Sequence, residues 1–163
     1  MSIGLQKQPR PAGSGQGFEA RILLIPAVLW LGVLIGASFL ATQVKIQAPS
    51  LDLPTALEVG RVTFALLTRV EWGLWALVAF AAALSRTRAG GWTLVIVLAV
   101  ILMVQSVWLL PVLDERIGRI IAGEAPPPSA HHLIYVIAEG LKALGLILLS
   151  AVAFRSGSPG ARA

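Results

Sequence analysis

Long apolar segments separated by short polar ones dominate this chain. Two of the segments, Ile22 to Val44 and Ala89 to Leu113, contain no charged residue. Two others, Trp72 to Ser85 and Ala143 to Phe154, are shorter and extend N-terminally into stretches where apolar residues mix with charges. A helix that crosses a bilayer needs about 20 mostly apolar residues. The pattern therefore predicts an all-α fold, a four-helix transmembrane bundle in which two of the spans carry charged residues.

The ends of the apolar segments set the expected boundaries. The N-terminal residues lack apolar periodicity, and the C-terminal ones are rich in Gly, Ser and Pro, so both ends are expected to be flexible or disordered cytoplasmic tails. The expected tails are residues 1–17 and 155–163, and the expected spans of the membrane domain 18–154 are about 18–42, 55–85, 91–111 and 129–154.

A short amphipathic helix is expected between the third and fourth spans. After Pro111, residues 112–122 place Leu113 and Ile117 with other apolar side chains on one face and the charges on the opposite face. Such a helix is typical of a membrane interface.

The composition changes this picture little and excludes several functions. The 163 residues are 56% hydrophobic and only 13% charged, whereas soluble domains are about 25% charged. The absence of cysteine excludes disulfides, thiolate metal sites and thiol catalysis. The net charge of +5 comes from basic residues that flank apolar segments, which indicates contact with lipid rather than nucleic acid. The expected partners are the lipid bilayer and either a second copy of the chain or another membrane protein.

The distribution of Lys and Arg predicts the orientation. Cytoplasmic loops of membrane proteins carry an excess of these residues. Here seven lie in the two tails and the turn between the second and third spans, and four lie on the opposite side. We therefore expect a multi-pass protein of the plasma (inner) membrane with both termini in the cytoplasm. The seven are Lys7, Arg10, Arg21, Arg86, Arg88, Arg155 and Arg162, and the four are Lys45, Arg61, Arg116 and Arg119.

Three spans place a polar residue at one depth. With a rise of 1.5 Å per residue, Glu71, Gln105 and Glu139 each lie roughly 6 Å outward of the middle of their span. Arg69 and Ser38 lie slightly further out. Ionisable residues inside a membrane face the bundle interior or a water-filled cavity, because exposing them to lipid costs several kcal/mol.

The fourth span has the most regular polar pattern. His132, Tyr135, Glu139 and Lys142 follow steps of three, four and three, which places them on one helix face and lets Glu139 and Lys142 pair. Those four residues, with Arg69, Glu71 and Gln105, form the candidate intramembrane polar site.

Two further features of the second and first spans bear on this site. The Arg69 and Glu71 side chains point about 200° apart on the helix, so they cannot both contact the same neighbouring helix equally well. Glu71 therefore needs a partner on another helix. In the first span, Gly32 and Gly36 form a small-xxx-small face that favours close helix packing.

Two interpretations of the polar site remain open. In the first, the charges neutralise one another and hold the helices together, and the protein is a structural or interaction subunit of the membrane. In the second, Glu139 or Glu71 lies in a crevice open to the outside and exchanges a cation or a proton, and the protein is a small transporter or an ion- or proton-translocating protein.

Neither enzyme activity nor a cofactor is expected. No Ser has a positioned His and acid, and no Gly-rich phosphate loop occurs. The two histidines, His131 and His132, are adjacent on a helix and point 100° apart, so one metal ion can hardly bind both.

Two stretches carry a resemblance to a family. The first, WLGVLIGASFLATQVKIQAPSLDLPTALEVGRVTFALLTRVEW, combines Trp30 and Gly32 in the first span, Lys45 and Pro49 in the link, and a Gly-Arg entry at Arg61. The second is LDERIGRIIAGEAPPPSAHHLIYVIAEGLKALGL. The chain resembles small bacterial four-helix membrane proteins of unknown function, themselves loosely similar to a domain of eukaryotic TMEM-type proteins. The resemblance implies a four-helix inner-membrane protein and no particular activity.

Overall fold

The described part of the chain is built from helices alone. The computed structural model describes residues 14–42, 44, 47 and 51–156, and these residues contain no strand. The link positions Lys45 and Pro49, and most of both expected tails, lie outside the described residues. In chain order the elements are α1 (Ser14–Leu34), the π-helix η1 (Ile35–Ala41), α3 (Leu53–Leu84), α4 (Ala89–Val104), the π-helix η2 (Gln105–Leu109), α5 (Leu110–Ile121) and α6 (His131–Ser156).

Four of these helical units are long and apolar enough to cross a membrane, as the sequence pattern predicted. Helix α1 begins at Ser14, inside the segment expected to be a tail. The third unit joins α4, η2 and α5 into one continuous helix. The four units are Arg21–Ala41, Leu53–Leu84, Ala89–Ile121 and His131–Arg155.

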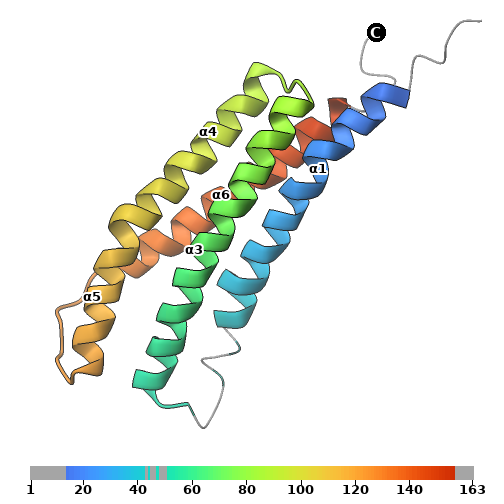
Figure 1. Ribbon diagram of the computed structural model, residues 1–163. Coiled ribbons are helices and arrows are strands. Elements are labelled where there is room, and N and C mark those ends of the chain that lie inside the picture. The colour runs from blue at the N-terminus through green and yellow to red at the C-terminus, as the bar shows by residue number, and fades with distance from the viewer. Residues whose placement is uncertain (1–13, 43, 45–46, 48–50, 157–163) are drawn as a thin grey trace, which may run out of the picture.

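The helices run antiparallel, up and down, in one bundle. The start of α1, the α3–α4 turn and the end of α6 lie at one end of the bundle, which we call the turn end (Figure 1). The start of α3 and the end of α5 lie at the opposite end, which we call the α5 end (Figure 1). Both ends of the described chain are therefore on the same side of the molecule.

Helix α3 begins with a capping arrangement. The Asp52 side chain accepts a hydrogen bond of 3.0 Å from the backbone N–H of Thr55. This hydrogen bonding lowers the pKa of Asp52 below its ordinary value. Pro54 follows in the first turn, where its missing N–H costs nothing. The sequence thus fixes where the long α3 starts.

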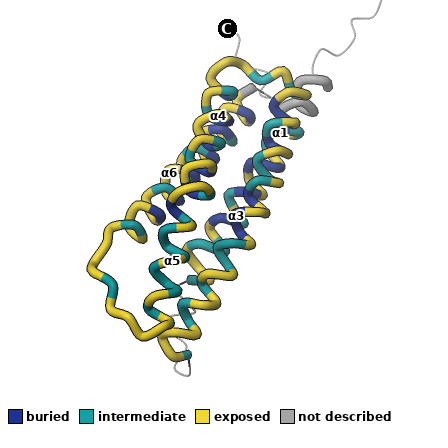
Figure 2. Tube along the Cα trace, turned by 60° about the vertical axis from the view of Figure 1, so that its left-hand side comes forward, coloured by how far each residue is buried: buried dark blue, intermediate teal, exposed yellow. Residues whose placement is uncertain are grey.

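The core and the outer surface are both apolar. The inward faces bury a continuous cluster toward the turn end, and Figure 2 shows this buried stripe along the helices facing the bundle axis. The outer faces carry many large apolar side chains, such as Ile25 at 67% exposure and Phe80 at 63%. Soluble monomers rarely expose a continuous apolar surface of this extent, so the outside of the bundle suits an apolar surrounding. The large side chains of this cluster that are less than 2% exposed are Trp30, Leu34, Leu98, Leu102, Leu146, Leu149, Val78 and Val95.

The third helix does not end at Pro111, contrary to the sequence-based boundary. Pro111 lies in the first turn of α5, directly after the π-helix η2, and the backbone continues to Ile121. A proline ring collides with the carbonyl one α-turn earlier, but the wider π turn before it changes the hydrogen bonding at that point. The amphipathic segment is therefore a continuation of the third helix, packed beside α3, rather than a separate element (Figure 1).

The close helix contact also differs from the expected one. A Cβ atom built at Gly32 or Gly36 would meet no atom within 4 Å, so neither glycine packs against another helix within the described chain. The close approach instead occurs at Gly145 of α6, where a Cβ would lie 3.2 Å from the Leu98 side chain of α4. Gly32 of α1 is exposed, and Gly36 of η1 is half-buried.

Candidate functional site

The Lys142 ammonium is the centre of a buried polar cluster. Its side chain is fully buried, and its Nζ lies 2.6 Å from both carboxylate oxygens of Glu71 on α3. The same Nζ lies 2.8 Å from Oε1 of Glu139, three residues earlier on α6. One cation therefore joins two carboxylates from two helices.

Glu71 is held by donors from two helices. Besides Lys142, it accepts a hydrogen bond of 3.0 Å from the indole N–H of Trp30 on α1. The structure thus places the partners of Glu71 on other helices, as its position opposite Arg69 predicted. Helices α1, α3 and α6 meet at this carboxylate.

Glu139 collects donors from the two π-helices. Its Oε1 accepts a hydrogen bond of 2.9 Å from the Gln105 side-chain amide in η2, and its Oε2 accepts one of 2.8 Å from the Ser38 hydroxyl in η1. A π turn holds an extra residue and often occurs at functional sites. Here each π segment presents a polar side chain to the same carboxylate. We call the six residues Trp30, Ser38, Glu71, Gln105, Glu139 and Lys142 the polar network.

The charged side chains of the network are buried. Glu71 and Glu139 are each 1% exposed, Gln105 is 2% exposed and Lys142 is fully buried. Removing an ion from water costs several kcal/mol, and only close pairing and complete hydrogen bonding offset that cost. The network supplies such partners from all four helical units, yet it contains two carboxylates and a single ammonium.

Two residues of the predicted polar site lie elsewhere. Arg69 is exposed on the outer surface of α3, and His132 is exposed on α6. Tyr135 is buried, at 3% exposure, one helical turn before Glu139. The predicted crevice does not reach the polar layer, because the carboxylates are enclosed. Glu71, Gln105 and Glu139, which share one depth, come together with Lys142, whose spacing from Glu139 allows the two to pair.

Sequence reasoning missed the role of Trp30. This residue is fully buried in the core, and its indole N–H donates a hydrogen bond to the Glu71 carboxylate. A signal was present, since Trp30 lies near the middle of its span, within reach of the depth of Glu71. Ser38 was not among the predicted site residues, and its hydroxyl, in the π-helix η1, donates a hydrogen bond to Glu139.

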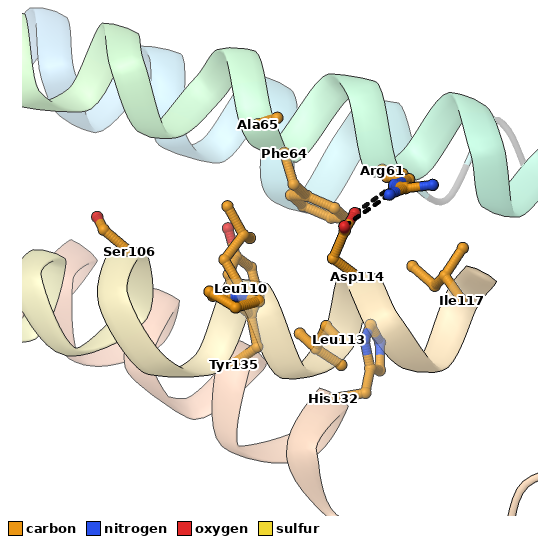
Figure 3. A pocket seen from close by; sticks show the side chains of 11 residues that line it. Arg61, Phe64, Ala65, Ser106, Leu110, Leu113, Asp114, Ile117, His132 and Tyr135 are labelled. Atoms are coloured by element: carbon orange, nitrogen blue, oxygen red, sulfur yellow. Dashed lines mark hydrogen bonds and ion pairs between the residues drawn. The ribbon is translucent and has the colours of Figure 1, made fainter. Parts of the chain in front are cut away.

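A cavity lies beside the network, toward the α5 end. It measures about 350 Å³ and lies between α3, α5 and α6 (Figure 3). Arg61 of α3 and Asp114 of α5 form an ion pair across it, and Phe64 packs edge-on against Tyr135 with ring centroids 5.1 Å apart. The cavity is lined by Ser106, which follows Gln105 directly in the chain, and by Tyr135, which lies one helical turn before Glu139. Its lining residues are Arg61, Phe64, Ala65, Ser106, Leu110, Pro111, Leu113, Asp114, Ile117, His132 and Tyr135.

Comparison with known proteins adds no relative. No protein-family model, curated protein or solved structure matches the chain.

Replacing Trp30 by Phe tests the hydrogen bond to Glu71. The change keeps the ring in the core and removes the N–H, so we expect the free energy of unfolding in detergent to fall by about 1.5–3 kcal/mol, the range for hydrogen bonds to charged groups. Trp75→Phe is the matched control, because the Trp75 N–H donates to the backbone carbonyl of Val95 instead. An equal or smaller loss in Trp30→Phe than in the control would contradict the role of the network.

Proposed function

We propose that the chain is an integral membrane protein that crosses the plasma (inner) membrane four times with both termini in the cytoplasm. The apolar outer surface of four long helices supports insertion. The antiparallel arrangement places both ends of the described chain and the basic α3–α4 turn on one side, which the excess of Lys and Arg assigns to the cytoplasm (Figure 1).

This orientation puts the α5 end on the outer side. The strongly amphipathic α5 then lies at the outer membrane interface, with its charged residues toward water. Its ion pair to Arg61 and the 32-residue length of α3 agree with helices that project beyond the apolar layer.

Single introduced cysteines test the orientation, since the chain has none of its own. Ala89 in the α3–α4 region and Ala125 between α5 and α6 are both exposed. We expect a membrane-impermeant thiol reagent to label Ala125→Cys from the outer face only and Ala89→Cys in inverted vesicles only. The reverse pattern would overturn the orientation, and labelling of both from one face would overturn the four-span topology.

We further propose that the protein is a structural or interaction subunit of the membrane, held together by the polar network. The observation that carries this proposal is the enclosure of Lys142 between Glu71 and Glu139, with further donors from the other two helical units. A buried group of charges and hydrogen-bonding side chains from several helices sets the register of the helices against one another.

The outer surface supports an interaction role. Arg69 is exposed on α3 at nearly the depth of the network, where a lone cation facing lipid is costly. A Cβ atom built at Gly32 of α1 or Gly36 of η1 would meet no atom within 4 Å, although such spacing allows another helix to approach closely. Both features fit a second copy of the chain or another membrane protein as partner.

Substituting Lys142 tests whether the network holds the fold. Lys142→Met leaves two buried carboxylates without a cation, so we expect the protein to lose about 3–5 kcal/mol of stability or to fail to accumulate in membranes. A second change, Glu71→Gln, removes one carboxylate from that variant and should restore much of the stability, as measured by thermal unfolding in detergent.

The control is Arg119→Met, which breaks the exposed Arg119–Glu124 pair. Exposed pairs contribute little, so this variant should behave like the wild type. If Lys142→Met were as stable as this control, the network would not be what holds the helices together.

A second candidate function is ion or proton translocation. The observation that favours it is the unequal count of two carboxylates to one ammonium, with a cavity that lies between the network and the α5 end. Intramembrane carboxylates of this kind mark ion and proton pathways in pumps and transporters.

Flux in reconstituted vesicles tests this candidate. We expect a pH gradient to drive acidification of vesicles that contain the wild type, and Glu139→Gln, which removes the titrating group, to abolish it. Glu124→Gln removes an exposed carboxylate far from the network and is the control. Flux that persists in Glu139→Gln, or no flux in correctly folded wild type, would exclude translocation through Glu139.

A further inference from the structure

The two carboxylates of the polar network have different kinds of hydrogen-bond partner, and this difference assigns a proton. We propose that the network holds one exchangeable proton in excess of the ion pair and that Glu139, not Glu71, carries it. The inference rests on the proposed membrane insertion and deepens the second candidate function by naming the bound species.

The excess charge is the starting point. With all three groups ionised, Glu71, Glu139 and Lys142 would leave one negative charge in a site at most 2% exposed. An uncompensated charge in a low-dielectric interior costs several kcal/mol, and a carboxylate there is neutralised instead. A metal ion is a poor candidate for this role, because the described residues contain no group of three or more His, Asp and Glu side chains.

Glu71 cannot accommodate a proton within its present contacts. Its partners are the ammonium of Lys142, at 2.6 Å from both oxygens, and the indole N–H of Trp30 at 3.0 Å. Both groups are donors only. A carboxylic acid at Glu71 would direct its O–H toward groups that have no lone pair to accept it, so Glu71 stays ionised and forms the permanent ion pair with Lys142.

Glu139 has partners that suit both protonation states. The Ser38 hydroxyl, 2.8 Å from Oε2, can donate to a carboxylate or accept from a carboxylic acid. The Gln105 amide, 2.9 Å from Oε1, carries both donors and an acceptor. When Glu139 is ionised, these groups donate to it, and when it is protonated either one can accept its O–H.

An unsatisfied atom beside Glu139 supports this assignment. The Gln105 Oε1 is buried and has no hydrogen-bond partner, one of two such side-chain atoms among the described residues. Rotating the amide by half a turn exchanges its oxygen and nitrogen at Glu139. The Gln105 oxygen then accepts a hydrogen bond from the O–H of protonated Glu139. Gln105 thus donates to Glu139 when it is ionised and accepts from Glu139 when it is protonated.

The surroundings of Glu139 include few other titratable groups. Its own helix α6 contributes Lys142 and the buried Tyr135, and α3 contributes Glu71, while η1 and η2 contribute only neutral side chains, Ser38 and Gln105. Arg69 is exposed on the outside of α3. Tyr135 lies one turn from Glu139 and lines the cavity, which makes the α5 end the nearer side for proton exchange (Figure 3).

Infrared spectroscopy of the full chain in lipid vesicles tests the proposal. We expect the wild type to show a carboxylic-acid C=O band from a buried group that decreases as the pH rises, and Glu139→Gln to lack it. Glu124→Gln, the exposed control, should retain it. A pH-dependent buried band that persists in Glu139→Gln would overturn the assignment to Glu139.

Stability separates Glu139 from Glu71. Gln resembles a protonated Glu, so Glu139→Gln should unfold at the same temperature as the wild type, within error. In Glu71→Gln the new amide faces the donors Trp30 and Lys142, and the unfolding temperature should fall. The opposite order would place the proton on Glu71. The wild type could also pass the cysteine-labelling test for insertion and show no carboxylic-acid band. That result would overturn the proposal of an exchangeable proton and would leave the proposed membrane insertion unaffected.

Discussion

The whole structure depends on how a lysine ammonium is kept out of water. Lys142 has no exposed surface, and its charge is balanced by carboxylates 2.6 and 2.8 Å away. Such a pair is stable only if the remaining carboxylate oxygens are also satisfied. Those requirements recruit Trp30 from α1, Ser38 from η1 and Gln105 from η2, so a single buried cation constrains every helical unit of the bundle.

The network divides the bundle into two unlike parts. Toward the turn end, apolar side chains fill the space between the helices, and Gly145 brings α6 close to α4. Toward the α5 end, α3, α5 and α6 separate around a cavity crossed by the Arg61–Asp114 pair. The proposed structural role and the proposed proton exchange therefore involve the same residues. These residues lie at the boundary between the closely packed half of the bundle and the half that contains the cavity.

Much of the charged centre could be predicted from the sequence. Helix rise alone places Glu71, Gln105 and Glu139 at one depth, and the spacing of Glu139 and Lys142 predicts their contact. These predictions succeed because the spans are nearly regular helices of known rise. The same regularity predicted four helical units.

Other features depend on information that periodicity does not contain. The choice between Arg69 and Glu71 as the inward residue is set by packing, since either could face the bundle when the helix is rotated. A hydropathy pattern does not indicate the hydrogen bond of the Trp30 N–H, because the rest of the side chain is apolar. The π segments η1 and η2 each break the 3.6-residue period, so regular helix geometry does not predict which way Ser38 faces or that the third helix continues past Pro111.

The outward position of Arg69 has a consequence for the lipid around the protein. A guanidinium on an apolar surface extends along its stem toward the nearest phosphates, or draws phosphates and water toward itself. In the proposed orientation it lies within the outer leaflet, roughly 9 Å from the middle of the span. Where no partner covers this face, Arg69 would fix the depth of the protein in the bilayer and thin the outer leaflet beside α3. The fit of the bundle to the bilayer would then depend on membrane thickness.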